Sequence, residues 1–203
     1  MQFTRTFVSA ISLIAATAHI SAEVIGNHPG LPSGYSFANI TWIGKVFENG
    51  SDVSITGSSM ENIEGQIREI NPDFSWGIQS HVKPAIPIQN DETHLTCDPN
   101  NIWWAQVFRI NEGIEYLKGI KGRCHVGPGP RVCTRVSCSY KSAISWCNDN
   151  SYGIDIDCSL WSQYAQDIVD ACQTHDASSR VRGQKFRDND KWNMLVGFDN
   201  NHC

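Results

Sequence analysis

The alternation of apolar and polar positions near the start of the chain predicts a β-hairpin. Residues 41–47 have the period-2 pattern of a strand, and residues 53–56 have the pattern of a returning strand. Between them, Asn49 and Gly50 form the Asn-Gly pair that favours a tight hairpin turn. We therefore expect two antiparallel strands in this part of the chain.

The apolar period then changes to that of a helix. Apolar residues recur every three or four positions as far as Ile70, and Asn71-Pro72 stops the run. Ser58 and Glu61 have the spacing of a capping box at the start of this helix. Residues 23–71 are thus predicted to form a ββα unit. Residues 72–96 contain three prolines and few periodic apolar positions, which is typical of a linker.

A second helical stripe follows Asp98-Pro99. Its apolar positions begin at Trp103 and end at Leu117, close to Gly119 and Gly122. Trp103 is predicted to be buried because it lies on the stripe. Trp104 is turned about 100° away from it, and an exposed tryptophan is a favoured interface residue. We therefore predict that Trp104 is exposed and is a candidate interface residue.

The remaining pattern alternates hairpins with a helix. Residues 131–137 and 143–146 predict two strands joined near residues 139–141, and residues 181–186 and 192–198 predict another pair. A helix is predicted over residues 159–172, with Asp157 or Ser159 as its N-cap. This order favours an α+β fold: a small, disulfide-rich, two-layer α/β sandwich over residues 97–203, with two helices on one antiparallel sheet.

The first 22 residues have the features of a secretory signal peptide. A cation at Arg5 precedes an apolar run, and small residues follow at Ser21 and Ala22. The run is shorter than the roughly 20 residues that a transmembrane helix needs. We therefore expect residues 1–22 to be removed and the product to be secreted, with no stable membrane insertion.

The chain contains eight cysteines, all from residue 97 onward: Cys97, Cys124, Cys133, Cys138, Cys147, Cys158, Cys172 and Cys203. An even number of cysteines in an exported protein predicts disulfides, here four, although eight cysteines allow 105 pairings and the sequence does not choose among them. Zinc is the alternative, but the C-x-x-C and H-x-x-x-H spacings of zinc sites are missing. We expect neither a metal nor a cofactor.

Net negative charge is confined to the front segment, residues 23–96. Residues 23–96 carry nine acids and three bases, whereas residues 97–203 carry twelve of each. This balance disfavours nucleic acid as a partner. The densest cationic stretch, residues 180–191, is diluted by acids and is interpreted as a solvated strand edge. Asn39 and Asn49 each begin an N-glycosylation sequon.

Candidate catalytic groups are few. Glycoside cleavage needs two carboxylates at a set separation, and Asp155, Asp157, Glu112 and Glu115 are the acids considered for it. Their positions before or on helices fit capping and solvated faces better. A ribonuclease-like site needs a histidine and a glutamate or second histidine around a phosphate, with an arginine to hold it. His125 beside Arg123 is the local pair. We predict no catalytic residues and no enzyme activity.

Segments of the cysteine-bearing half resemble cysteine-rich secreted proteins of filamentous fungi. The resemblance lies in residues 122–124, 131–140 and 143–150, the helix ending at Cys172, residues 183–184, and residues 192–196 before Cys203. The helix–strand–helix order and the C-terminal cysteine are similar to those of the smut-fungus killer-toxin family. More loosely, they are similar to those of necrosis-inducing extracellular effectors of plant-pathogenic fungi. This resemblance implies a disulfide-locked α/β sandwich without enzymatic activity that acts on a membrane protein or a host receptor.

Three functions are therefore considered. The first is a secreted fungal effector, monomeric, that binds a protein of a plant host. The second is a killer-toxin-like protein that acts on a membrane target of competing fungi. The third is a secreted ribonuclease-like hydrolase, with His125 as its central residue.

Overall fold

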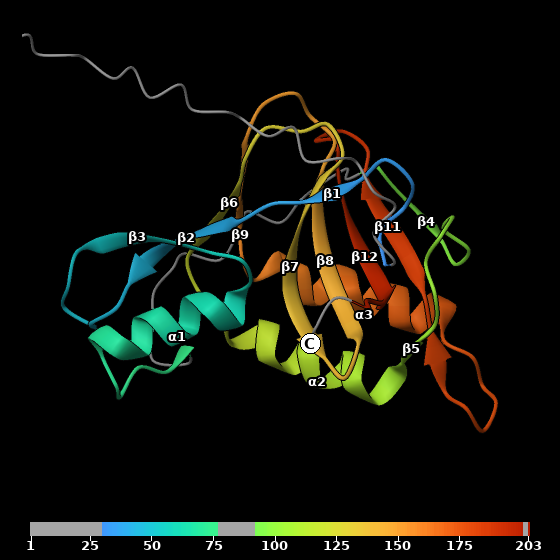
Figure 1. Ribbon diagram of the computed structural model, residues 1–203, viewed down its shortest axis with the longest axis horizontal. Coiled ribbons are helices and arrows are strands. Elements are labelled where there is room, and N and C mark those ends of the chain that lie inside the picture. The colour runs from blue at the N-terminus through green and yellow to red at the C-terminus, as the bar shows by residue number, and fades with distance from the viewer. Residues whose placement is uncertain (1–29, 77–91, 201–202) are drawn as a thin grey trace, which may run out of the picture.

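The computed structural model describes residues 30–76, 92–200 and 203, which fold into three helices and twelve strands (Figure 1). The helices are α1 (Met60–Ile70), α2 (Val107–Gly119) and α3 (Leu160–Cys172). The strands are β1 (Ser36–Phe37), β2 (Ile40–Lys45), β3 (Asp52–Gly57), β4 (Thr93–Thr96), β5 (Ala105–Gln106), β6 (Arg123–Val126), β7 (Val132–Ser139), β8 (Ser142–Asn148), β9 (Ile154–Asp157), β10 (Arg180–Val181), β11 (Gly183–Arg187) and β12 (Trp192–Phe198). The predicted signal peptide, residues 1–22, lies outside the described residues.

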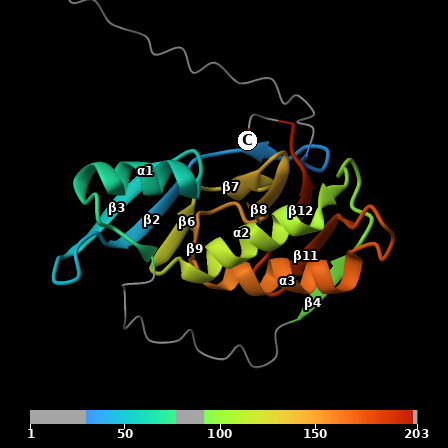
Figure 2. The same ribbon diagram turned by 90° about the horizontal axis from the view of Figure 1, so that it is seen from below.

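The largest sheet has six strands in the order β1-β7-β8-β12-β11-β4. All its pairs are antiparallel except β1 with β7. Helices α2 and α3 lie side by side across one face of this sheet (Figure 2). The predicted disulfide-rich α+β fold, with two helices on an antiparallel sheet, is therefore confirmed.

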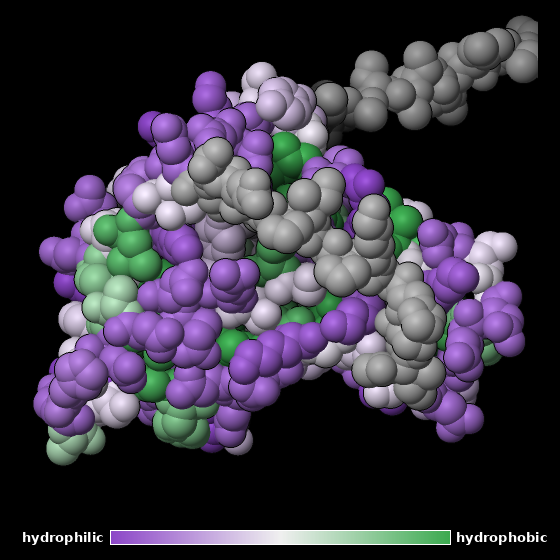
Figure 3. Space-filling model, turned by 180° about the vertical axis from the view of Figure 1, so that it is seen from behind, coloured by the Kyte–Doolittle hydropathy of each residue, from purple (hydrophilic) through white to green (hydrophobic). Residues whose placement is uncertain are grey.

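The two central strands of this sheet are buried on both faces. Ile144, Trp146 and Met194 belong to the main core beneath the helices. On the opposite face, Leu31 and Ile102 cover the sheet in a smaller cluster of their own, together with Cys133, Cys147 and Leu195. Because β8 and β12 contact protein on both sides, their buried positions do not alternate. Seen from behind, hydrophilic side chains predominate on the surface and hydrophobic ones lie between them (Figure 3).

The front hairpin belongs to a second sheet, of four strands in the order β3-β2-β6-β9. The predicted strands and helix are present, and β2 also pairs antiparallel with β6 of the cysteine-bearing half. The N-cap of α1 is Ser59 and not the predicted Ser58, because the Asn62 backbone N–H donates to Ser59 Oγ at 3.2 Å. The ββα unit therefore shares a sheet with the rest of the protein.

The predicted linker, residues 72–96, is described only at its two ends, and both ends are packed. Phe74 and Trp76 are buried and contact Trp42 edge to face. At the other end, β4 pairs with β11 and forms an edge of the large sheet. Apolar side chains of the front segment and of the cysteine-bearing segment form one core cluster. Residues 77–91 lie outside the described residues.

The eight cysteines form four disulfides, as the even count predicted. The pairs are Cys97–Cys172, Cys124–Cys158, Cys133–Cys147 and Cys138–Cys203. The first joins the end of β4 to the end of α3, the second joins β6 to the start of α3, and the third crosses between β7 and β8. The fourth ties β7 to the C-terminal residue.

Candidate binding surface

Exposed aromatic side chains from separate parts of the chain gather near the start of α2. Trp103, Phe108 and Tyr140 are 61%, 53% and 70% exposed. Arg109, Lys141 and Phe198 are connected to these three residues by contacts with aromatic rings. We call the six residues the aromatic surface: Trp103, Phe108, Arg109, Tyr140, Lys141 and Phe198.

Ring contacts connect the members of the aromatic surface in two groups. The Arg109 guanidinium lies over two rings, 3.9 Å from the centroid of Tyr140 and 4.5 Å from that of Phe108. The ring of Trp103 stacks on Phe198 with a centroid separation of 5.8 Å, and Lys141 Nζ lies 5.8 Å from the same Phe198 ring. The two groups are connected through the backbone, because Tyr140 of one group and Lys141 of the other are consecutive in the chain.

The backbone fixes how these side chains are presented. Tyr140 and Lys141 are the two turn residues between β7 and β8, and both have positive φ, 48° and 63°. A two-residue turn of this kind matches the twist of a hairpin and places both side chains at its tip. The Phe198 N–H donates to the Trp103 carbonyl at 2.9 Å, which holds the Trp103 segment against the end of β12. The sequence predicts this turn, but no local pattern marks its side chains as part of a surface.

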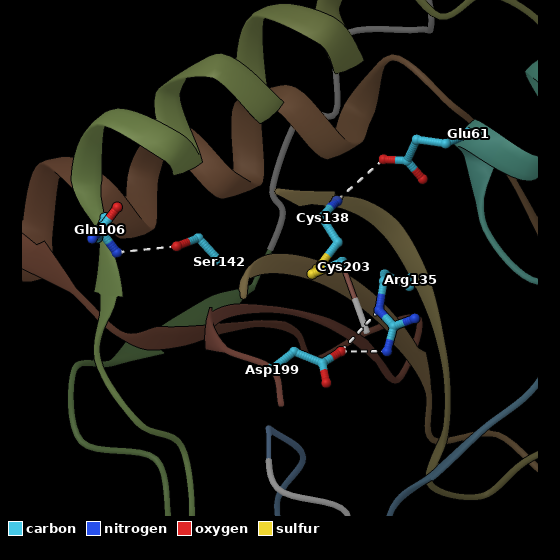
Figure 4. The surroundings of a disulfide bond; sticks show 7 residues. All are labelled: Glu61, Gln106, Arg135, Cys138, Ser142, Asp199 and Cys203. Atoms are coloured by element: carbon cyan, nitrogen blue, oxygen red, sulfur yellow. Dashed lines mark hydrogen bonds and ion pairs between the residues drawn. A yellow bond between two sulfur atoms is a disulfide. The ribbon is translucent and has the colours of Figure 1, made fainter. Parts of the chain in front are cut away.

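Polar contacts and a disulfide hold chain segments next to the residues of the aromatic surface (Figure 4). The Gln106 N–H donates to Ser142 Oγ at 3.2 Å, and the Cys138 N–H donates to Glu61 Oε1 at 3.1 Å. Arg135 pairs with Asp199, whose side chain is 2% exposed, through its Nε at 2.8 Å and its Nη2.

These contacts restrain the backbone close to Phe108, Lys141 and Phe198. Gln106 precedes Phe108 by two residues, Ser142 follows Lys141, and Asp199 follows Phe198. The Cys138–Cys203 disulfide lies two residues before Tyr140. The aromatic side chains are therefore held on a fixed backbone, as a preorganised binding surface requires.

The predicted exposures of the two neighbouring tryptophans are wrong. Trp103 is exposed, whereas Trp104 is half-buried beneath Arg182 and Arg180, whose guanidinium carbons lie 4.6 Å and 5.8 Å from its ring. The helix begins at Val107 and not near Trp103, because Ala105–Gln106 pairs with β10 as a strand. The helical spacing used for both tryptophans therefore does not apply to them.

The structure brings His125, Arg123 and Asp155 together on the outer face of the four-stranded sheet. His125 Nδ1 lies 3.3 Å from Asp155 Oδ1, and Arg123 Nη2 lies 4.0 Å from Asp155 Oδ2. His125 and Asp155 are opposite each other in the β6–β9 pairing. The sequence suggests Asp155 only as a carboxylate for glycoside cleavage and does not predict its pairing with His125.

The other candidate carboxylates make local contacts. Glu112 pairs with Arg109 at 2.9 Å and Glu115 pairs with Lys118 at 2.6 Å, both within α2. Asp157 Oδ1 accepts from the backbone N–H and the hydroxyl of Ser159 at the start of α3. These three acids thus have the solvated and capping positions that their sequence context favoured.

The cationic stretch after residue 179 is not the edge strand that we expected. Strand β11 lies between β12 and β4. Its cations are paired, Lys185 with Asp167 at 2.5 Å and Arg187 with Asp190 at 2.7 Å, and Arg182 pairs with Asp98. These side chains therefore stabilise the fold locally and do not form a row of free charges.

Several further findings bear on function. Asn39 and Asn49, the residues of the two sequons, are both exposed. Within residues 30–76, 92–200 and 203, no three His, Cys, Asp or Glu side chains are grouped to hold a metal ion. None of the three described helices is long and apolar enough to cross a membrane.

Comparison with known proteins adds no relative. Neither the protein-family models, nor the curated proteins, nor the solved structures give a match to this chain. The fold and the surface geometry are therefore the basis for a functional proposal. The four disulfides are consistent with a secreted or extracellular protein.

Proposed function

We propose that this protein is a secreted fungal effector that binds a protein of a plant host through its aromatic surface, as a monomer and without catalysis. The observation that carries this proposal is the concentration of exposed Trp103, Phe108 and Tyr140 around Arg109. Tryptophan, tyrosine and arginine are the residues enriched in binding hot spots. Isolated exposed apolar residues are common on proteins, but a contiguous set indicates an interaction site.

The composition of the surface suggests the chemistry of the partner. Its aromatic rings supply apolar contact area. Lys141 lies beside them as a cation, whereas Arg109 is already paired with Glu112 at 2.9 Å. Such a surface suits a partner with an apolar centre and carboxylates at its rim, since complementary charges increase the association rate. A host or competitor protein fits this description better than nucleic acid.

The fixed backbone beneath the surface supports binding without folding. The turn at Tyr140 is held by the Cys138–Cys203 disulfide, and the Arg135–Asp199 pair holds the end of β12. A surface that is already ordered loses little conformational entropy on association. The disulfides thus contribute to binding as well as to stability.

The test compares variants of the mature protein infiltrated into leaf tissue. The double variant Trp103→Ala, Tyr140→Ala is expected to lose the plant response, because each truncation removes an exposed ring and costs about 2 kcal/mol of binding at a hot spot. Phe47→Ala is the matched control, since Phe47 is 52% exposed but lies beyond the end of β2, outside the aromatic surface. An equal loss of response in both variants, with thermal unfolding unchanged, would contradict the proposal.

Two parallel measurements separate the alternatives. Growth inhibition of competing fungi, lost with the same double variant, would replace the plant target by a microbial one. Degradation of RNA that is abolished by His125→Ala would favour the ribonuclease-like hydrolase, because His125 with Asp155 and Arg123 is the arrangement in the structure closest to that chemistry.

A further inference from the structure

A cavity beside β9 lies apart from the aromatic surface. Its volume is about 410 Å³, and its lining includes Arg123, Tyr152, Asp155, Asn189, Asp190 and Trp192. One wall is formed by the segment that leads into β9, and the other by the turn between β11 and β12. Cavities of this size hold small organic ligands.

The charged groups of the cavity leave hydrogen-bonding capacity for a ligand. Arg123 Nη2 and Asp155 Oδ2 are 4.0 Å apart, which is beyond hydrogen-bond distance. The Arg123 side chain is 64% exposed and the Asp155 side chain 39% exposed. A donor and an acceptor therefore stand near each other, both open to solvent, at a separation that two neighbouring hydroxyls can bridge. One hydroxyl would accept from Arg123 and the other would donate to Asp155.

Neighbouring residues hold this pair in place. His125 Nδ1 lies 3.3 Å from Asp155 Oδ1, which fixes the carboxylate while its second oxygen faces Arg123. Gly153 allows the histidine ring to take this position, because a Cβ at residue 153 would lie 2.7 Å from His125 Cε1. The carboxylate is thus oriented by a contact outside the cavity.

The cavity also offers an aromatic side chain. Tyr152 is 63% exposed at the cavity, whereas Trp192 is 2% exposed and belongs to the core. An exposed ring provides a flat apolar surface on which the C–H face of a sugar ring can lie, and its hydroxyl can donate or accept a hydrogen bond. A pyranose has hydroxyls around an apolar C–H face, so it binds best where polar side chains surround one aromatic ring.

The charge balance argues against an anionic ligand. Asp155 and Asp190 face the single cation Arg123 across the lining, and Asp190 also pairs with Arg187 at 2.7 Å. A phosphate or sulfate group placed near Arg123 would be repelled by the neighbouring carboxylate. A neutral polyhydroxylated ligand avoids this cost, since its hydroxyls donate to carboxylates and accept from the guanidinium.

We infer that the cavity between β9 and the β11–β12 turn is a binding site for a neutral saccharide, with Arg123 and Asp155 engaging adjacent hydroxyls and Tyr152 stacking on the sugar ring. This inference is independent of the aromatic surface. It gives the protein a second contact, to a glycan, at a different place from its protein partner.

The test uses the full mature chain, isotope-labelled, and follows amide chemical shifts. Neutral trisaccharides of β-linked glucose, α-linked mannose and β-linked N-acetylglucosamine are each added to about 10 mM, which nearly saturates a site with a Kd of about 1 mM. At least one is expected to shift the amides of residues 152–155 and 189–190 in a saturable way. If none of the three sugars shifts any of these amides, the inference is overturned.

Variants then test the assigned roles. Asp155→Asn and Tyr152→Ala are each expected to weaken binding of that sugar roughly tenfold, or about 1.4 kcal/mol. Asp52→Asn is the matched control, because Asp52 is exposed on β3 at the opposite edge of the same sheet. Unchanged affinity in both cavity variants would overturn the inference. Tighter binding of inorganic phosphate or of adenosine 5′-monophosphate at the same amides would overturn it as well, and would favour a nucleotide ligand.

Discussion

At the residue scale, tryptophans and the groups beside them determine which parts of this protein are buried and which are presented. Trp42 is fully buried, and its Nε1 donates to the Lys121 carbonyl at 2.6 Å. Gly122, with φ of +107°, allows this approach, because a Cβ there would lie 2.7 Å from Trp42 Nε1. Trp103 has the opposite role and is exposed. Residue type alone does not distinguish these two environments.

Glu64 provides a residue-scale prediction about pH. Burial raises the pKa of Glu64, but hydrogen bonds from Trp76 Nε1 at 2.8 Å and Arg68 at 3.0 Å and 2.8 Å outweigh it, so the net pKa lies below its usual value of 4.5. A lowered folded-state pKa adds stability that is present above pH 4.5 and is lost as the pH falls through the folded-state pKa.

Glu64→Gln is therefore expected to lower the free energy of unfolding by about 1–2 kcal/mol at pH 7. The difference from the parent protein should shrink as the pH falls below 4.5. Urea unfolding at several pH values measures both. Glu69→Gln, an exposed position on the same helix, is the control. A Glu64→Gln deficit that stays constant down to pH 3 would contradict the assigned cause.

At the element scale, disulfides connect the strands to the helices and differ in accessibility. Cys124–Cys158 and Cys133–Cys147 have both partners fully buried. Cys97–Cys172 and Cys138–Cys203 each have one exposed partner, Cys97 and Cys203. A reductant attacks sulfur directly, so its rate of reaction depends on access.

We expect mild reductant to open Cys97–Cys172 and Cys138–Cys203 first, while the two buried bridges remain. Alkylation of the freed thiols followed by peptide mass spectrometry identifies the order. Reduction of Cys133–Cys147 before either exposed bridge, in protein that retains its native circular dichroism, would show that this order of accessibility is wrong. Partly reduced protein also tests the aromatic surface, because Cys138 lies two residues before Tyr140 in the chain.

Sequence patterns predicted most of the helices and strands, and where they failed the reason can be identified. The hairpin β7–β8, both long strands of the C-terminal pair and α3 follow from apolar period and turn residues, and they are confirmed. Strand β9 was missed because its four residues give too short a pattern. The start of α2 was misplaced because residues 105–106 pair with β10, and the paired residues are far apart in the chain, as Gln106 and Arg180 show.

At the scale of the whole molecule, the front segment and the cysteine-bearing segment share one core. Trp42 on β2 faces Cys124 across the β2–β6 pairing, and α1 contributes Met60, Ile63 and Ile67 to the same cluster. Elements that share a core unfold together, because neither part can bury its apolar face alone.

Trp42→Ala is accordingly expected to destabilise the entire protein by about 3–5 kcal/mol. Calorimetry should show a single transition at a lower temperature, with near-ultraviolet and far-ultraviolet circular dichroism changing together. Residues 97–203 expressed alone are expected not to fold cooperatively. Two separate transitions, of which Trp42→Ala shifts only one, would instead indicate two independent domains.

The candidate sites differ in how far sequence could locate them. His125 and Arg123 were recognised because they are close in the chain, but Asp155 joins them only through the β6–β9 pairing. The aromatic surface combines residues 103, 108–109, 140–141 and 198, which no local pattern connects. Periodicity describes one element at a time, whereas a surface is made by several elements meeting.

By itself, the sequence determined the α+β class, the positions of most helices and strands, and the number of disulfides, because apolar period, turn residues and an even cysteine count act locally or by simple counting. Only the tertiary structure decided which cysteines pair, that β2 joins β6, which of two adjacent tryptophans is exposed, and that Asp155 meets His125 and Arg123. These features depend on contacts between residues far apart in the chain, and folding alone brings those residues together.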